Sequence, residues 1–123
     1  MDCLFCKIIN GEVPSYTCYE DEFVKCIMDA NPYMPGHTLI IPKKHYTTFL
    51  DMDNDIIIKV HDIAKILMKK MMEKYPNINS VKVVINYGEE QKVKHYHMHL
   101  IPLYDYEKLP DITQEEFCNM LKD

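Results

Sequence analysis

The chain has 123 residues, which is enough for one domain with its own hydrophobic core. Hydrophobic residues make up 47% of it and charged residues 27%, the usual balance of a soluble globular protein. The formal net charge of −5 argues against nucleic acid as a general partner, and no apolar run approaches the roughly 18 residues of a membrane span.

In chain order, the first expected element is a short helix that Asp2 caps, that runs to about Asn10 and that stops at Gly11. A hairpin with strands at 17–19 and 23–28 is expected next. A loop rich in proline and glycine at 31–36 then precedes a strand at 37–41, which Pro42 ends.

The longest helix is expected from Asp53 or Asn54 to about Tyr75, because apolar residues recur there in steps of three and four. Two strands, at 81–87 and 94–103, and a weak helix at 113–121 complete the chain. Strands joined by hairpins, with the helices set apart, predict a single α+β domain over residues 1–123 on an antiparallel sheet.

The stretch HYHMHLIP at 95–102 places three of the six histidines at every second position. In a strand, His95, His97 and His99 point to one face, with neighbouring imidazoles about 7 Å apart. That spacing is too wide for three ligands of one ion, but it suits groups with different tasks along an extended substrate. A half-buried strand that happens to carry histidines is the alternative.

This stretch resembles the His-φ-His-φ-His-φ-φ signature (φ is apolar) of the histidine triad (HIT) nucleotide hydrolases and transferases, in particular the Hint type. The segment PGHTLIIPKKH at 35–45 resembles the family's upstream block, and LFCKIINGEVP at 4–14 resembles its N-terminal block. The resemblance covers roughly residues 3–102. It implies a five-stranded antiparallel sheet that pairs with a second copy into a ten-stranded homodimer.

A neutral imidazole nitrogen can attack phosphorus at pH 7 without a separate base, and nearby donors then stabilise the charge on the phosphoryl oxygens. The resemblance implies that His97 is this nucleophile and that water hydrolyses a nucleotidyl-histidine intermediate, which releases a nucleoside monophosphate such as AMP. It implies that His99 contacts the phosphate and leaving group and that His37 lines or orients the site. A histidine at the edge of a loop is the alternative for His37.

The pair Cys3 and Cys6 forms a CxxC. A redox pair, two unconnected core cysteines and half of a tetrahedral zinc site are the three interpretations. The resemblance supplies two further ligands, His45 and His95, and so implies a structural zinc ion with four protein ligands. Because Cys3 already belongs to a motif, we expect no secretion signal before the fold. Without such a signal, we expect the five cysteines, an odd number, to be reduced thiols in a cytoplasmic protein.

The resemblance also implies a purine nucleotide site, in which Phe5 supplies an aromatic wall and Asp29 accepts both ribose hydroxyls. Plain core packing for Phe5 and an Asx turn for Asp29 are the alternatives. The implied nucleotide-binding residues are Leu4, Phe5, Ile8, Ile27, Asp29, Ala30, Asn86, Gln91, Val93, His97 and His99.

The chain departs from the family pattern between Asn86 and His95, where two residues and a glycine are missing and Lys92 replaces a common Ser or Thr. Lys92 is either solvated or a phosphate donor. The leading function is hydrolysis of nucleoside phosphoramidates or other nucleotidyl compounds. The alternatives are a dinucleoside polyphosphate hydrolase or phosphorylase and a non-catalytic, zinc-stabilised nucleotide-binding or scaffold protein.

Overall fold

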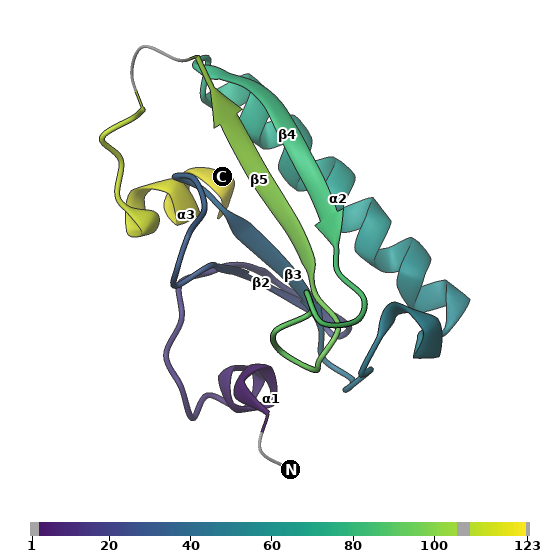
Figure 1. The fold of residues 1–123 in the computed structure, drawn as a ribbon. Coiled ribbons are helices and arrows are strands. Elements are labelled where there is room, and N and C mark those ends of the chain that lie inside the picture. The colour runs from purple at the N-terminus through teal and green to yellow at the C-terminus, as the bar shows by residue number, and fades with distance from the viewer. Residues whose placement is uncertain (1–2, 106–108, 123) are drawn as a thin grey trace.

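The structure, a computed structural model, describes residues 3–105 and 109–122. Its strands form one antiparallel sheet in the order β1-β2-β3-β5-β4 (Figure 1). The elements are α1 (Leu4–Ile9), β1 (Thr17–Glu20), β2 (Val24–Met28), β3 (Thr38–Pro42), a 3₁₀ turn (Phe49–Asp51), α2 (Asn54–Lys74), β4 (Ile78–Ile85), β5 (Met98–Tyr104) and α3 (Gln114–Lys122). The expected α+β fold on a five-stranded antiparallel sheet is confirmed.

The central strand β3 is buried on both faces, which divides the interior into two cores. Ile40 faces the larger core, while Leu39 and Ile41 face the smaller one, as the two-residue period of a strand requires. The larger core lies between the sheet and helices α2 and α3, and the smaller core lies under α1.

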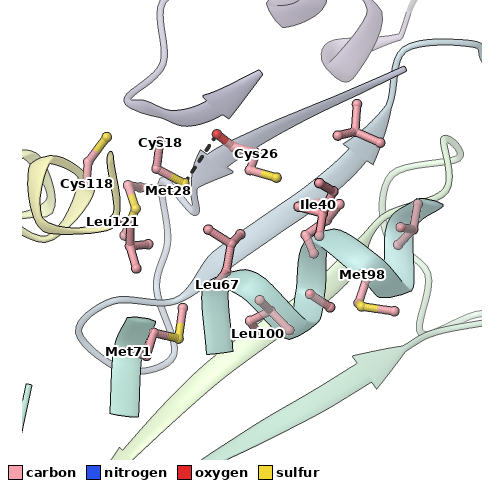
Figure 2. Close-up of a cluster of buried hydrophobic side chains, with 14 of the residues drawn as sticks. Cys18, Cys26, Met28, Ile40, Leu67, Met71, Met98, Leu100, Cys118 and Leu121 are labelled. Atoms are coloured by element: carbon pink, nitrogen blue, oxygen red, sulfur yellow. Dashed lines mark hydrogen bonds between the residues drawn. The ribbon is translucent and has the colours of Figure 1, made fainter. Parts of the chain in front are cut away.

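The expected apolar face of α2 is confirmed. Its buried residues are Val60, Ile63, Ala64, Leu67 and Met71. Figure 2 shows Leu67 and Met71 packed over the sheet residues Ile40, Met98 and Leu100. The cysteines outside the CxxC, which are Cys18, Cys26 and Cys118, also fill this core, as expected for small apolar side chains.

Helix α1 begins differently from the prediction. Its N-cap is Cys3, whose Sγ accepts a hydrogen bond from the Cys6 backbone N–H at 3.4 Å, and Asp2 lies outside the described residues. Phe5 and Ile8 then point into the smaller core against Ile27, Leu39 and Ile41. The CxxC therefore lies at the start of a helix whose buried face reaches the sheet.

The last strand begins at Met98, whereas the sequence predicted a strand from Lys94. The backbone at 93–95 bends because Tyr96 N–H donates to the Tyr46 carbonyl at 2.7 Å instead of joining the ladder with β4. The alternation of faces survives this bend, since Tyr96 and Met98 enter the larger core while His97 contacts Phe5 on the other side. The strand before it, β4, begins at Ile78, three residues earlier than expected.

Across residues 3–105 and 109–122, no helix combines the length and the apolar character needed to cross a membrane.

Candidate active site and metal cluster

A cavity of about 410 Å³ opens between α1, the end of β2 and the segment that leads into β5. Its wall is mainly apolar, with Phe5 edge-on to the His97 ring at 4.9 Å between centroids. Of the nucleotide-binding residues expected from the sequence, the cavity is lined by Leu4, Phe5, Ile8, Ile27, Asp29, Ala30, Asn86, Val93, His97 and His99. An apolar pocket with a few convergent polar groups is the usual form of a small-molecule site.

Gln91 is absent from this lining. Its side chain is buried and its Nε2 donates to the carbonyl oxygens of Thr47 at 2.6 Å and Val93 at 3.2 Å. The bond to Thr47 therefore holds the loop against the segment after β3, and the bond to Val93 is made within the loop itself. Gln91 therefore stabilises the loop next to the cavity and does not line the cavity itself.

His97 has its tautomer set by the backbone. Its Nδ1 lies 2.9 Å from the carbonyl oxygen of His95. A carbonyl oxygen only accepts hydrogen bonds, so Nδ1 carries the proton and Nε2 keeps its lone pair. Burial lowers the pKa of His97, which keeps the ring neutral at pH 7.

His37 and His99 form a chain behind the cavity. The Tyr33 backbone N–H donates to His37 Nδ1 at 3.0 Å, so the proton of neutral His37 lies on Nε2. This Nε2 is 2.9 Å from His99 Nδ1 and 3.4 Å from Asp29 Oδ2. His99 Nδ1 is then an acceptor, and His99 carries its own proton on Nε2.

The rings of His97 and His99 are closer together than the sequence predicted. Their centroids are 4.8 Å apart, against the expected 7 Å, in an edge-on arrangement with 62° between the ring planes. Burial, together with the neighbouring His97 and His37, lowers the pKa of His99 to about 4. Burial also lowers the pKa of His37, so the rings of His37, His97 and His99 are all neutral near pH 7.

Asn86 and Asp29 border the His99 end of the cavity. The Asn86 amide lies 3.5 Å from His99 Nε2, and a half-turn of the amide brings its oxygen into position to accept the His99 proton. Asp29 Oδ1 accepts from the Asn31 N–H at 2.8 Å. The Asx turn weighed from the sequence is therefore present, and Asp29 lines the cavity as well.

The second feature of the site is a cluster of Cys3, Cys6, His45 and His95, whose ligand atoms all lie within 4.8 Å of one another. His45 Nδ1 is 3.2 Å from Cys6 Sγ, and His95 Nδ1 is 3.5 Å from both sulfurs. A tetrahedral zinc ion with bonds of about 2.3 Å to sulfur and 2.0 Å to nitrogen sets these atoms about 3.5 Å apart. The observed spacing fits such an ion.

The tautomer of His95 fits a metal as well. Its Nε2 donates to the Pro42 carbonyl at 2.8 Å, which leaves the Nδ1 lone pair facing the two sulfurs. A metal-bound imidazole commonly donates its other N–H to a carbonyl in this way. The cluster could therefore hold zinc with no change in the hydrogen bond from His95 Nε2 to the Pro42 carbonyl.

Asp29, His37 and His99 also bring three possible ligand atoms together, but their hydrogen bonds do not suit a metal. A neutral His37 that bound an ion through Nε2 would carry its proton on Nδ1, where the Tyr33 N–H already points. Two donors would then face each other. The hydrogen bonds of this trio therefore do not suit a metal, whereas those of the cysteine and histidine cluster are compatible with one.

Lys92 lines the rim of the cavity and is also exposed, with its Nζ 3.1 Å from the Glu89 carbonyl. Its exposure agrees with a solvated lysine, and its place in the cavity lining agrees with a phosphate donor. Sequence reasoning missed three other contacts of the site, made by the Tyr33 amide, the Tyr104 hydroxyl and the Gln114 side chain. No local pattern marks the contacts of Tyr104 and Gln114, because their partners are backbone carbonyls 69 and 85 residues away. The Tyr33 amide contacts the His37 ring four residues later, and a backbone N–H is present at almost every position.

The comparisons with known proteins agree with this geometry. The model of the HIT domain matches residues 10–106. An uncharacterized HIT-like protein of Methanocaldococcus jannaschii is 42% identical over 107 residues, which cover 84% of this chain and 80% of the relative. The adenosine 5′-monophosphoramidase HNT1 of Saccharomyces cerevisiae is 37% identical, with 84% of this chain and 63% of the relative covered.

Two further similarities bear on the site. The adenylylsulfatase HINT3 of Arabidopsis thaliana is 38% identical over 82% of this chain and 52% of the relative. A crystal structure of a zinc-bound histidine triad protein from Mycobacterium smegmatis superposes with a TM-score of 0.88 at 31% identity, over 99% of this chain and 91% of that one. Together with the family match, HINT3 and HNT1 support nucleotide hydrolysis as the general class of activity. The chain belongs to the histidine triad (HIT) family.

Proposed function

We propose that this protein hydrolyses nucleotidyl compounds through a nucleotidyl-histidine intermediate on His97. The observation that carries the proposal is the hydrogen bond from His97 Nδ1 to the His95 carbonyl, which leaves the Nε2 lone pair on a ring that lines the cavity. A neutral imidazole of this tautomer is a nucleophile that needs no base.

In the first step, Nε2 of His97 attacks the α-phosphorus of the nucleotide. The nitrogen–phosphorus bond forms, the bond to the leaving group breaks with its electron pair, and the leaving group takes a proton from solvent water. His99 stays neutral, and its Nε2–H donates a hydrogen bond to the leaving group. His37, which donates to His99 Nδ1 and lies beside Asp29, stabilises the orientation of His99 throughout. The result is a nucleoside monophosphate held on His97.

In the second step, water attacks the same phosphorus. The nitrogen–phosphorus bond breaks with its electron pair returning to His97 Nε2, the proton of the attacking water passes to solvent, and the nucleoside monophosphate is released. The ring of His97 regains its lone pair. His99 stays neutral throughout, as a hydrogen-bond donor to the phosphoryl group in which charge builds up.

The apolar part of the cavity takes the base of a purine nucleotide, with Phe5, Ile8 and Ile27 around it. Asp29, at the polar end, accepts the ribose hydroxyls through its carboxylate. Asn86 lies near the ribose and phosphate, because it borders His99. A cavity of about 410 Å³ suits one nucleoside monophosphate and leaves a small leaving group at its mouth.

The names of two relatives, a monophosphoramidase and an adenylylsulfatase, share an adenosine nucleotide and differ in the group that is released. We therefore expect adenosine 5′-phosphoramidate to be a better substrate than a diadenosine polyphosphate. Comparison of kcat/KM for the two compounds tests this. A clear preference for the diadenosine polyphosphate would assign the second enzyme function, and turnover of neither compound would contradict the proposal.

We also propose that the cluster of Cys3, Cys6, His45 and His95 holds one structural zinc ion. Four protein ligands complete a tetrahedron, so the ion stabilises the fold, and it links the start of α1 to the segment before His97. Burial and the neighbouring Cys3 raise the pKa of Cys6, and a divalent cation removes this obstacle to thiolate formation. Reduced sulfurs are needed, which supports a cytoplasmic location.

We further propose that two copies form a homodimer through β4 and α2. The strand β4 is at the edge of the sheet, with Val83 exposed, and an edge strand offers backbone groups to a second chain. Helix α2 exposes Ile58, Ile66 and Met72 on its outer side. Light scattering that gives the mass of one chain at micromolar concentration would contradict this assembly.

A further inference from the structure

The connection between β2 and β3, residues 29–37, carries both Asp29 and His37. Its ends meet through one backbone hydrogen bond, from Asp29 N–H to the His37 carbonyl at 2.9 Å. Side chains from the C-terminal part of the chain make further contacts with this connection, and Figure 1 shows α3 beside it. The position of two site residues therefore depends on elements that follow the triad in sequence.

The contact nearest the cavity comes from Gln114, the first residue of α3. Its Nε2 donates to the backbone carbonyl of Asp29 at 2.5 Å. The side-chain carboxylate of the same Asp29 makes separate contacts, to Asn31 N–H and toward His37 Nε2. Gln114 thus holds the backbone of Asp29 and does not contact its carboxylate.

Two more contacts hold the far part of the connection. The Tyr104 hydroxyl donates to the Pro35 carbonyl at 2.6 Å. The ring of buried Phe117 lies directly on Gly36, so closely that a Cβ at this position would overlap the ring. Gly36 also has φ +87°, which a residue with a side chain rarely adopts.

Helix α3 is itself fixed at both ends. At its start, Thr113 and Glu116 form a capping box, with bonds of 3.1 Å and 3.0 Å between each side chain and the other's N–H. At its end, the Nζ atoms of Lys70 and Lys74 on α2 donate to the carbonyls of Leu121 and Met120. The helix therefore meets the connection as a rigid body.

We propose that α3 is a positioning element of the nucleotide site and that Gln114 is the residue that sets Asp29 against the ribose. This inference rests on the proposed function and deepens it. Helix α3 lies beyond residues 10–106, which the family model matches. Selectivity for ribose over a sugar without the 2′- and 3′-hydroxyls is thus partly set by a contact from outside the matched region.

The test is Gln114→Glu, which replaces the donor with a carboxylate that repels the Asp29 carbonyl. An acidic residue in the first turn of a helix is compatible with the helix dipole, so α3 should stay folded. The matched control is Asn119→Asp, the same change of amide to acid at an exposed position of the same helix. Gln114→Ala, which removes the donor without adding charge, is a second variant.

The measurement is kcat/KM for adenosine 5′-phosphoramidate and for its 2′,3′-dideoxyadenosine counterpart, which lacks both hydroxyls that Asp29 accepts. We expect Gln114→Glu to lower the value for the ribonucleotide about tenfold and the value for the dideoxynucleotide less than about twofold. Gln114→Ala should show the same pattern with a smaller loss, and Asn119→Asp should change neither value.

If Gln114→Glu leaves both kcat/KM values unchanged, or lowers both by the same factor, the inference is overturned and the proposed function stays in place. Equal losses would show that Gln114 serves only the general integrity of the fold. Absence of turnover by the unmutated protein would instead overturn the proposed function, and the inference with it.

Discussion

His95 and His97 are connected by a hydrogen bond of 2.9 Å from the His97 Nδ1 to the His95 carbonyl oxygen. The ring of the same His95 turns the other way, with Nδ1 toward Cys3 and Cys6 and Nε2 bound to the Pro42 carbonyl. One residue therefore contributes its ring to the cluster of Cys3, Cys6, His45 and His95 and its backbone to the orientation of the candidate nucleophile. This cluster and the cavity are adjacent, because His95 and His97 are two residues apart.

Replacement of His97 by Ala should abolish turnover and preserve the fold and nucleotide binding. The ring supplies the attacking nitrogen, and loss of a covalent nucleophile lowers kcat by several orders of magnitude. Steady-state kinetics and nucleotide titration measure the two effects. His61→Ala is the matched control, because His61 is exposed on α2 and its ring contacts the Ile57 carbonyl of the same helix. Retained activity in His97→Ala would exclude a covalent step on this residue.

Metal analysis of protein purified without added metal should give about one zinc per chain. The double variant Cys3→Ser, Cys6→Ser should lose this metal and lower Tm more than it lowers activity at 25 °C, because a four-ligand ion stabilises structure without binding substrate. Chelation followed by return of zinc should lower and then restore Tm. Protein that contains no zinc, or that forms a Cys3–Cys6 disulfide under reducing conditions, would refute this prediction.

Lys92→Ala should change kcat/KM by less than about threefold. Its Nζ is engaged with the Glu89 carbonyl at the exposed rim, and a solvated charge of this kind contributes little. Lys94→Ala is a close control, since its Nζ bonds the Gly88 carbonyl of the same loop and the residue is outside the cavity lining. A selective loss of about tenfold or more in Lys92→Ala would assign a direct phosphate contact, because such bonds are worth about 1.5–3 kcal/mol.

The free energy of unfolding should fall as the pH is lowered from about 6.5 to about 4. Burial lowers the pKa of His99 to about 4 in the folded protein, whereas an unfolded histidine titrates near 6.5. In this interval the unfolded state binds more protons, so stability rises with pH and levels off above it. Burial lowers the pKa of His97 and His37 as well, which adds to the same trend.

Urea unfolding at several pH values between 4.5 and 7.5 measures this dependence. His99→Gln, which removes one titrating ring at a site that keeps its hydrogen-bonding capacity, should show a shallower slope. Protonation of the metal ligands acts in the same direction in both proteins, so the difference between them reports His99. A slope equal to or steeper than that of the unmutated protein would contradict the assignment.

The sequence predicted the faces of the elements better than their ends. The alternation from His95 to Leu100 separated the histidines from the larger core correctly, because a period of two depends only on local backbone geometry. The start of β5 was wrong, since the bend before Met98 depends on a bond from Tyr96 to Tyr46, fifty residues earlier. The ring spacing was wrong for a related reason, as side-chain tilt follows from tertiary contacts.

The site residues divide in a similar way. His97, His99 and Asp29 were predictable because they stand in recognisable patterns of sequence, and the structure brings them to one cavity. The position of Gln91 was not predictable, because its partner is the Thr47 carbonyl, and any residue has a carbonyl. The contact from Gln114 has the same character. Long-range bonds to backbone atoms leave no trace in composition or spacing.

The stereochemical course at phosphorus tests the central claim most directly. The substrate is an adenosine 5′-phosphoramidate analogue with one non-bridging oxygen replaced by sulfur and one configuration at phosphorus, hydrolysed in ¹⁸O-labelled water. Two in-line displacements, first by His97 and then by water, predict overall retention of configuration in the released nucleotide. Inversion would show a single displacement by water and would contradict an intermediate on His97.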